Sequence, residues 1–221
     1  MCKCGIFADI VASKITNKDF DEGRDMAWTI PVGGTKERKL AELILYISQK
    51  CVLDPNFGSV KLNKILYFSD YLSFGHRGKA ITGVKYQHLE QGPAPNALVP
   101  VRNQMIEKSE LKMETRITFL GYPQKRTIAL RDPDKSTFDD GDLDVVDQVI
   151  EALSERTATE ASNISHREVG WLTTKMHEDI PYASIFLSDE PLSPAEVRYA
   201  QSEWKNMMKG LETEAGAQLG L

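Results

Sequence analysis

The sequence predicts an α+β fold that is predominantly α-helical and carries a small antiparallel β-sheet or hairpin. Apolar residues repeat at helical spacing in several stretches, and residues 111–132 combine strand-like alternation with a central turn. The chain has 221 residues, of which 41% are hydrophobic and 27% are charged. This composition is typical of a globular protein, and a chain of this length buries roughly 70–75% of its unfolded surface.

The first predicted helix follows residue 36 and ends at "DPNFGS". Its apolar face consists of Leu40, Leu43, Ile44, Ile47 and Cys51. A second helix is predicted over 61–74, with an apolar arc made of Leu62, Ile65, Leu66, Phe68 and Leu72. Its opposite side carries Tyr67, Tyr71 and Phe74 beside Lys64. These aromatic side chains need a second layer to cover them, which is either another helix of the same domain or a partner protein.

The middle of the chain predicts strands around one helix. "ITGVKYQHL", residues 81–89, reads as a strand, and a helix is expected within "APNALVPVRNQMIEKS", where Pro100 limits its start. "LKMETRITFL", a "GYPQK" turn and "RTIALRD" predict a hairpin. The side chains expected on the half-buried face of its first strand are Met113, Thr115, Ile117 and Phe119.

The last third of the chain is predicted to be helical. One amphipathic helix contains Leu143, Val146, Val149, Ile150 and Leu153. Shorter helices are expected around "TATEASNIS" and "REVGWLTTKMH". A final helix should begin at "SPAE", where Ser193 is the N-cap and Glu196 completes a capping box.

We expect three segments: an arm or linker over 1–36, a helical domain over 37–210 and a tail over 211–221. The first residues show no signal peptide, and no apolar stretch nears 18 residues. The three cysteines, an odd and low count, are typical of a reducing compartment. These features predict a cytoplasmic protein.

Motifs that suggest chemistry do not fit the spacing that the chemistry requires. "GHRGKA", 75–80, is too short for a phosphate-binding loop and is predicted to end a helix. "DGDLDVVDQVIE", 140–151, resembles a calcium-binding loop, but Val145 stands where such a loop requires glycine, so a helix start is favoured. Cys2 and Cys4 are too few for a metal site. We therefore expect no metal, no cofactor and no enzymatic activity. A small hydrolase using His88, Glu90 or His166 remains an alternative.

Charge is distributed unevenly along the chain. Residues 112–131 contain five basic residues and one acidic residue, whereas 132–155 contain nine acidic residues and one basic residue. These stretches are either two solvated faces or a surface that docks a charged partner. The net charge of −5 gives no reason to expect nucleic acid as a partner, and no membrane partner is expected either.

Two blocks of the sequence resemble the Panacea antitoxin domain, a family also described as SocA-like or phage GepA-like. The first block is "KLNKILYFSDY" followed by "GKAITGVKYQHLEQGPAP", in which Ile65 and Ala94 depart mildly from the family pattern. The second, weaker block consists of "SHREVGW" and "IPY". The resemblance covers roughly residues 38–200.

The resemblance implies a mostly helical domain that neutralises a toxin, encoded by the adjacent gene, by binding it directly. It also implies an association with phages and mobile elements, and one branch of the family delivers its toxin to a protease. A proteolytic adaptor or a host-directed phage protein is therefore an alternative. The surface predicted to contact the partner consists of Lys64, Tyr67, Tyr71, Tyr86, His88, Gln91, Gly92 and Pro93.

Several residues of these two blocks are expected to have structural roles. Gly83 and Gly92 are expected to adopt backbone angles that other residues resist, and Pro93 to fix φ after the strand. His88 is expected to be exposed or hydrogen-bonded, and His166 to be structural or to cap a helix.

Overall fold

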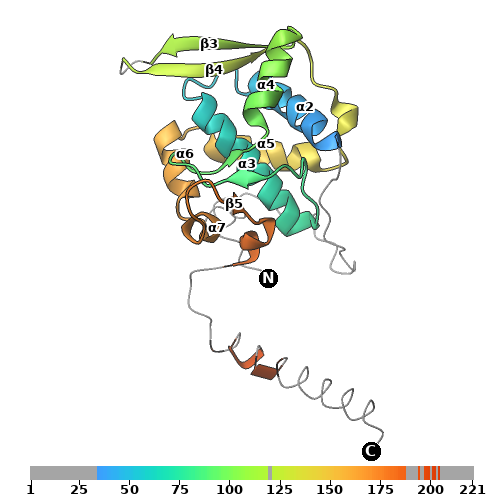
Figure 1. Cartoon of the computed structure of the whole chain (residues 1–221), viewed down its shortest axis with the longest axis vertical. Coiled ribbons are helices and arrows are strands. Elements are labelled where there is room, and N and C mark those ends of the chain that lie inside the picture. Colours follow the sequence, from blue (N-terminus) through green and yellow to red (C-terminus); the bar gives the residue numbers. More distant parts are fainter. Residues whose placement is uncertain are drawn as a thin grey trace, which may run out of the picture. The chain divides into compact units, whose positions relative to one another are not determined.

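The computed structural model describes residues 34–118 and 121–187, together with helical positions 194, 197–199, 201–202 and 204. The chain divides into two units, Met1–Leu187 and Ser188–Leu221. The first unit is α+β and predominantly helical, as predicted (Figure 1). No helix in the described part of the chain is long and apolar enough to cross a membrane. The predicted N-cap Ser193, most of the arm 1–36 and the tail 211–221 lie outside the described residues.

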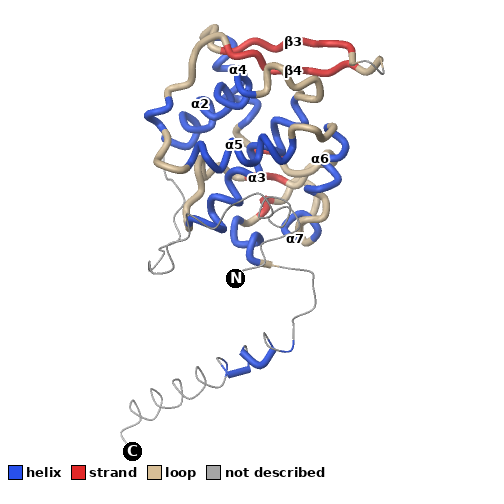
Figure 2. The backbone as a smooth tube through the Cα atoms, turned by 180° about the vertical axis from the view of Figure 1, so that it is seen from behind, coloured by secondary structure: helices blue, strands red, loops and turns tan. Residues whose placement is uncertain are grey.

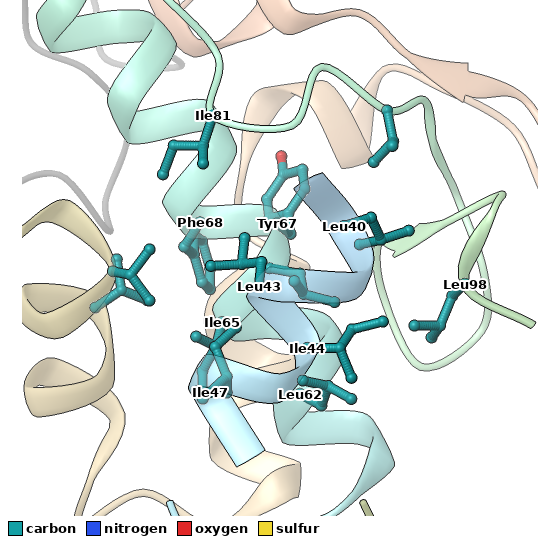
Figure 3. Packing of buried hydrophobic residues seen from close by; sticks show 14 of the residues in the cluster. Leu40, Leu43, Ile44, Ile47, Leu62, Ile65, Tyr67, Phe68, Ile81 and Leu98 are labelled. Carbon is teal, nitrogen blue, oxygen red and sulfur yellow. The ribbon is translucent and has the colours of Figure 1, made fainter. Parts of the chain in front are cut away.

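Two helices form the centre of the first unit. α2 spans Thr35–Lys50, so it begins slightly before its predicted start and ends before Cys51, and α3 spans Ser59–Arg77, slightly longer than its prediction. Their apolar faces meet in a buried cluster to which Leu43, Ile65 and Phe68 belong (Figure 3). α3 ends at Gly78, which has a left-handed φ of 69°. The predicted helix end is therefore confirmed at "GHRGKA".

α3 is surrounded by the remaining elements, which Figure 2 shows from behind. It packs against α2, α5, α6 and the 3-10 helix η2. The helices in the last part of the first unit are, in chain order, η1 (Lys135–Thr137), α5 (Asp142–Leu153), α6 (Ala158–Ser165), α7 (Val169–Leu172) and η2 (Tyr182–Phe186). α5 confirms the predicted amphipathic helix. α7 is much shorter than predicted, because the chain turns away after Leu172 to reach the first sheet.

The first sheet is small and joins distant parts of the sequence. β1 (Tyr86–Gln87) lies between β2 (Ala94–Pro95) and β5 (Asp179–Ile180), and both pairings are antiparallel. The strand predicted over 81–89 is thus reduced to two residues. The preceding stretch is buried but held by a side chain instead of a strand, since Thr82 donates its backbone N–H to Asp70 Oδ1 at 2.7 Å.

The predicted hairpin is confirmed, but its predicted burial is wrong. α4 (Leu98–Glu107) leads into β3 (Leu111–Ile117), which pairs in register with β4 (Pro123–Ala129). Ile117 was expected on the half-buried face and is 69% exposed. The hairpin extends past the helices, as Figure 1 shows, and it contacts them through β4, where Gln124 Nε2 donates to the Pro55 carbonyl at 3.1 Å, so the end of β3 stays uncovered. Phe119 lies outside the described residues.

The hairpin base is fixed to the loop between α2 and α3. Arg126 is buried, and its guanidinium donates to the carbonyl oxygens of Cys51, Val52 and Asp54 at 3.0–3.2 Å. Thr127 shares a 2.7 Å hydrogen bond with Ser48 on α2. These contacts hold β4 against the helical body.

Candidate partner-binding site

Three segments converge beside α3: the turn that contains Gly92, the end of α6, and α7. Gly92 has a φ of +87°, and a β-carbon there would lie 2.6 Å from Lys64 Nζ and would collide with Ser165 Oγ. Lys64 Nζ donates to the Pro93 carbonyl at 3.0 Å, and Ser162 Oγ donates to the Gln91 carbonyl at 2.9 Å. Glycine is therefore required for the turn to approach both helices this closely.

Lys64 is held in an environment that disfavours its charge. The residue is 1% exposed, and burial lowers the pKa of its amine from 10.5 to about 7. A buried ammonium loses its hydration, so the neutral amine is the stable form when no carboxylate compensates. The amine thus acts as a hydrogen-bond donor that closes the turn onto α3.

Tyrosines fill the space next to Lys64. The rings of Tyr71 and Tyr182 stack with centroids 4.6 Å apart, and Tyr67 and Tyr86 meet edge to face at 5.5 Å. Two of their hydroxyls bond to backbone: Tyr71 donates to the Ile180 carbonyl at 2.6 Å, and Tyr182 donates to the Val84 carbonyl at 2.8 Å. The layer that covers the aromatic side of α3 is therefore β1 together with η2, a 3-10 helix of the same unit, in line with the predicted cover by a helix of the same domain.

Asp70 connects this tyrosine cluster to the first sheet. Its carboxylate accepts the Thr82 hydroxyl at 2.5 Å and the Tyr86 hydroxyl at 2.7 Å. Burial raises the pKa of Asp70, and the hydrogen bonds from Thr82 and Tyr86 oppose this rise. The Asp70 carboxylate thus fixes the segment around Thr82, just before β1, to α3.

Trp171 is held between the two histidines that the sequence analysis singled out. The rings of His88 and His166 each lie 4.2 Å from the Trp171 ring and are nearly parallel to it. Trp171 Nε1 donates to the Leu89 carbonyl at 3.4 Å, and His88 Nδ1 is 3.2 Å from Thr174 Oγ1. His166 occupies the C-cap position of α6 through its backbone, and its imidazole packs on Trp171, which fits the structural role expected for it. Burial lowers the pKa of His166, and the nearby basic groups of Lys64 and His88 act in the same direction. This stack joins α6 and α7 to the turn before Gly92.

The structure brings the predicted partner-binding residues together but places most of them inside the protein. Those with buried side chains or backbone are Lys64, Tyr67, Tyr71, Tyr86, His88, Gly92 and Pro93, and Gln91 is exposed. Their role in partner binding stays a prediction, and the buried ones can act only by shaping the exposed rim. Gly83 and Gly92 both have the predicted positive φ.

Exposed apolar side chains follow this cluster on α7 and the turn after it. Leu172 is 54% exposed, Met176 is 49% exposed, and Trp171 is half-buried. We call these three residues the α7 surface. Met and Trp are enriched at protein interfaces, and Trp is among the residues that contribute most to binding.

No sequence pattern predicts the α7 surface as a binding site. Trp171 was quoted as part of the second block, but Leu172 and Met176 carry no local signal, because single exposed apolar residues are common. Their meaning comes from the packed cluster behind them. No group of three or more metal-ligating side chains lies close together within the described residues, so the two histidines form a stack on Trp171 without a third ligand.

A comparison with known protein families matches residues 62–172 to the antitoxin SocA-like, Panacea domain. The chain belongs to the SocA-like Panacea family. No curated protein and no solved structure matches it. The matched segment of the Panacea domain runs from α3 to the end of α7 and contains Lys64, Gly92 and Trp171. β5 and Tyr182, which complete the first sheet and the tyrosine cluster, follow it in the chain.

Proposed function

We propose that this protein is a cytoplasmic antitoxin that neutralises the toxin encoded by the adjacent gene by binding it directly, without catalysis. The observation that carries the proposal is that residues of both Panacea motif blocks pack into one cluster around Trp171, which is followed directly in the chain by the exposed apolar side chains of Leu172 and Met176. A rigid cluster behind an exposed apolar centre favours binding, because little conformational entropy is lost on association.

The packing around Lys64 supports binding instead of turnover. Its amine and the Ser165 hydroxyl are both buried, and Gly92 fills the space in front of them. A nucleophile must reach a substrate atom at about 3 Å, and these two groups are closed off by the turn. We therefore assign Lys64 to shaping the turn and the α7 surface to the contact with the toxin.

The proposal is tested by growth rescue with matched surface variants. The neighbouring protein is expressed alone and then with this protein, either wild type or L172D/M176D, and complex formation is followed by co-purification. The control is V99D/L130D, which replaces side chains that are 53% and 49% exposed on α4 and after β4, at the other end of the unit from α7 in Figure 1.

We expect wild type and the control to restore growth and to co-purify with the toxin. L172D/M176D should lose both properties, because a buried unpaired carboxylate at an interface centre costs several kcal/mol. Rescue that persists in L172D/M176D would move the contact away from α7. Rescue by wild type without any stable complex would contradict neutralisation by binding and favour a proteolytic adaptor.

A further inference from the structure

The acidic and the basic stretches of the sequence differ in how their charges are paired. In the acidic stretch, carboxylates pair with basic residues of the same chain: buried Asp142 with Arg77 at 2.6 Å, and Asp147 at the surface with Lys50 at 2.7 Å. Two of the five basic residues are also structural, since Arg126 is buried and Arg131 pairs with Glu42 at 2.7 Å. The remaining basic residues, Lys112, Arg116 and Lys125, are exposed on the hairpin.

These exposed basic residues lie on the β3–β4 hairpin, which we call the hairpin arm and which is fixed to the helices through β4. The base of β4 is fixed by Arg126 and Thr127, while the far end extends past the helices (Figures 1 and 2). Ile117 and Tyr122, near the far end, are each 69% exposed. Arg116 pairs with Glu114 on the same strand, and within the described residues neither Lys112 nor Lys125 has a carboxylate partner. The arm therefore combines net positive charge with two exposed apolar side chains.

The outer edge of β3 has backbone groups available for another strand. The backbone bonds Leu130 N–H to Glu110 and Thr118 N–H to Tyr122 fix the phase of the hairpin ladder. The backbone N–H and C=O groups of the even-numbered residues of β3 therefore bond to β4. Those of odd-numbered residues such as Thr115 point to the other side, away from β4. β3 pairs with no other strand in 34–118 or 121–187. Pro123 agrees with this phase, because it stands opposite Ile117, where no ladder N–H is needed.

We propose that an extended acidic segment of the toxin adds to the outer edge of β3 as a further strand. The hairpin would then be a second contact in addition to the α7 surface. This inference rests on the proposed function. Strand addition supplies backbone hydrogen bonds, and the charges of Lys112 and Lys125 attract acidic side chains and speed association. A second copy is the competing occupant, because antiparallel pairing of two β3 edges about Thr115 would place Glu114 opposite Arg116, and the test below separates it from the toxin.

Two variants test the two parts of the inference. K112E/K125E reverses the arm charge, and T115P removes the outward N–H without removing a bond of the β3–β4 ladder. The control for charge is K36E/K79E, which makes the same change in net charge at the start of α2 and after the C-terminal end of α3, whereas the hairpin contacts the N-terminal end of α3 through Ser59. Each variant is first checked for the wild-type circular dichroism spectrum and urea midpoint. Association and dissociation rates with the neighbouring protein are then measured at about 0.05 M and about 0.3 M NaCl, where screening differs strongly.

The expected results distinguish the arm from the α7 surface. K112E/K125E should lower the association rate at least tenfold at low salt and abolish its salt dependence. T115P should raise the dissociation rate at least tenfold, and K36E/K79E should do neither. If wild type binds and both arm variants bind equally well, the strand-addition proposal is wrong and the proposed function stands. A wild-type chain that does not bind the neighbouring protein overturns both. Salt-dependent self-association or duplex-DNA retention that K112E/K125E abolishes would assign the arm to that occupant instead.

Discussion

Lys64 and Gly92 depend on each other at the scale of single residues. The turn passes so close to α3 that no β-carbon fits at Gly92, and this closeness removes water from the Lys64 amine. The desolvated amine then becomes the donor that holds the Pro93 carbonyl. A lysine in a helix sequence would ordinarily be read as solvent-facing, and here it is part of the core.

The lowered pKa of Lys64 predicts a pH dependence of stability. In the unfolded chain a lysine has a pKa of about 10.4, so between about pH 7 and 10 the unfolded state binds a proton that the folded state does not. The free energy of unfolding should therefore rise with pH across this window, with a slope approaching about 1.4 kcal/mol per unit. Below pH 7 both states carry the proton and the slope vanishes.

Lys64→Met should remove this slope while keeping the aliphatic packing. Urea unfolding of wild type and K64M at several pH values from 6 to 9.5 measures the difference, with about half a pH unit between points. Two curves that run parallel across the whole range would show that the Lys64 amine is charged in the folded protein.

Gly92→Ala should destabilise the protein more than Gly121→Ala. Both glycines have positive φ, +87° and +83°, but no atom lies within 4 Å of a β-carbon at Gly121. The backbone strain is thus common to both variants, at about 1–2 kcal/mol, and only G92A adds overlap with Lys64 and Ser165, at about 1–3 kcal/mol. Urea midpoints measure both, and equal losses would mean that the turn moves away without cost.

At the scale of secondary-structure elements, a few charged side chains fix one element to another. The clearest case is the start of α5. Asp142 is fully buried at the first turn, pairs with Arg77 and accepts the Asp139 N–H at 3.0 Å. Asp144 belongs to the same turn but is exposed. The acidic run that resembled a calcium loop is therefore a helix start that fixes α5 to the end of α3.

Asp142→Ala and Asp144→Ala separate anchoring from the helix dipole. D142A should cost about 2–4 kcal/mol, since it removes the buried carboxylate that Arg77 and the Asp139 N–H both donate to. D144A should cost less than about 1 kcal/mol, because only the dipole interaction is lost. Chemical unfolding gives both values, and a similar loss in the two variants would contradict the anchoring role of Asp142.

At the scale of the whole molecule, the buried apolar cluster of the described residues lies in the first unit. It begins at Leu40 and ends at Ile185, within Met1–Leu187. A chain that ends after Leu187 keeps every described residue of this cluster, so its free energy of unfolding should be within about 0.5 kcal/mol of that of the full chain. Far-UV circular dichroism in urea measures this transition, and a loss above that value would mean that residues after 187 stabilise the unit.

Long periodic segments were predicted well because one helix face decides them. The apolar spacing placed α2, α3 and α5 within a few residues, and the turn at 121–125 located the hairpin. The short elements were predicted poorly. β1 has two residues and α7 has four, and such lengths are set by neighbours instead of by a local pattern.

The sequence by itself determined the predominantly helical class, the main helices, the hairpin and, through its two motif blocks, the Panacea family. Only the tertiary structure decided that Lys64 and the tyrosines are buried, that Trp171 stacks on two histidines, and that Lys112 lies on a strand whose outer edge is free. The physical reason is that periodicity reports which face of a segment is apolar, whereas burial of a polar side chain depends on partners far away in the chain. Lys64 is closed in by Pro93 and Ser165, and no local pattern around residue 64 contains that information.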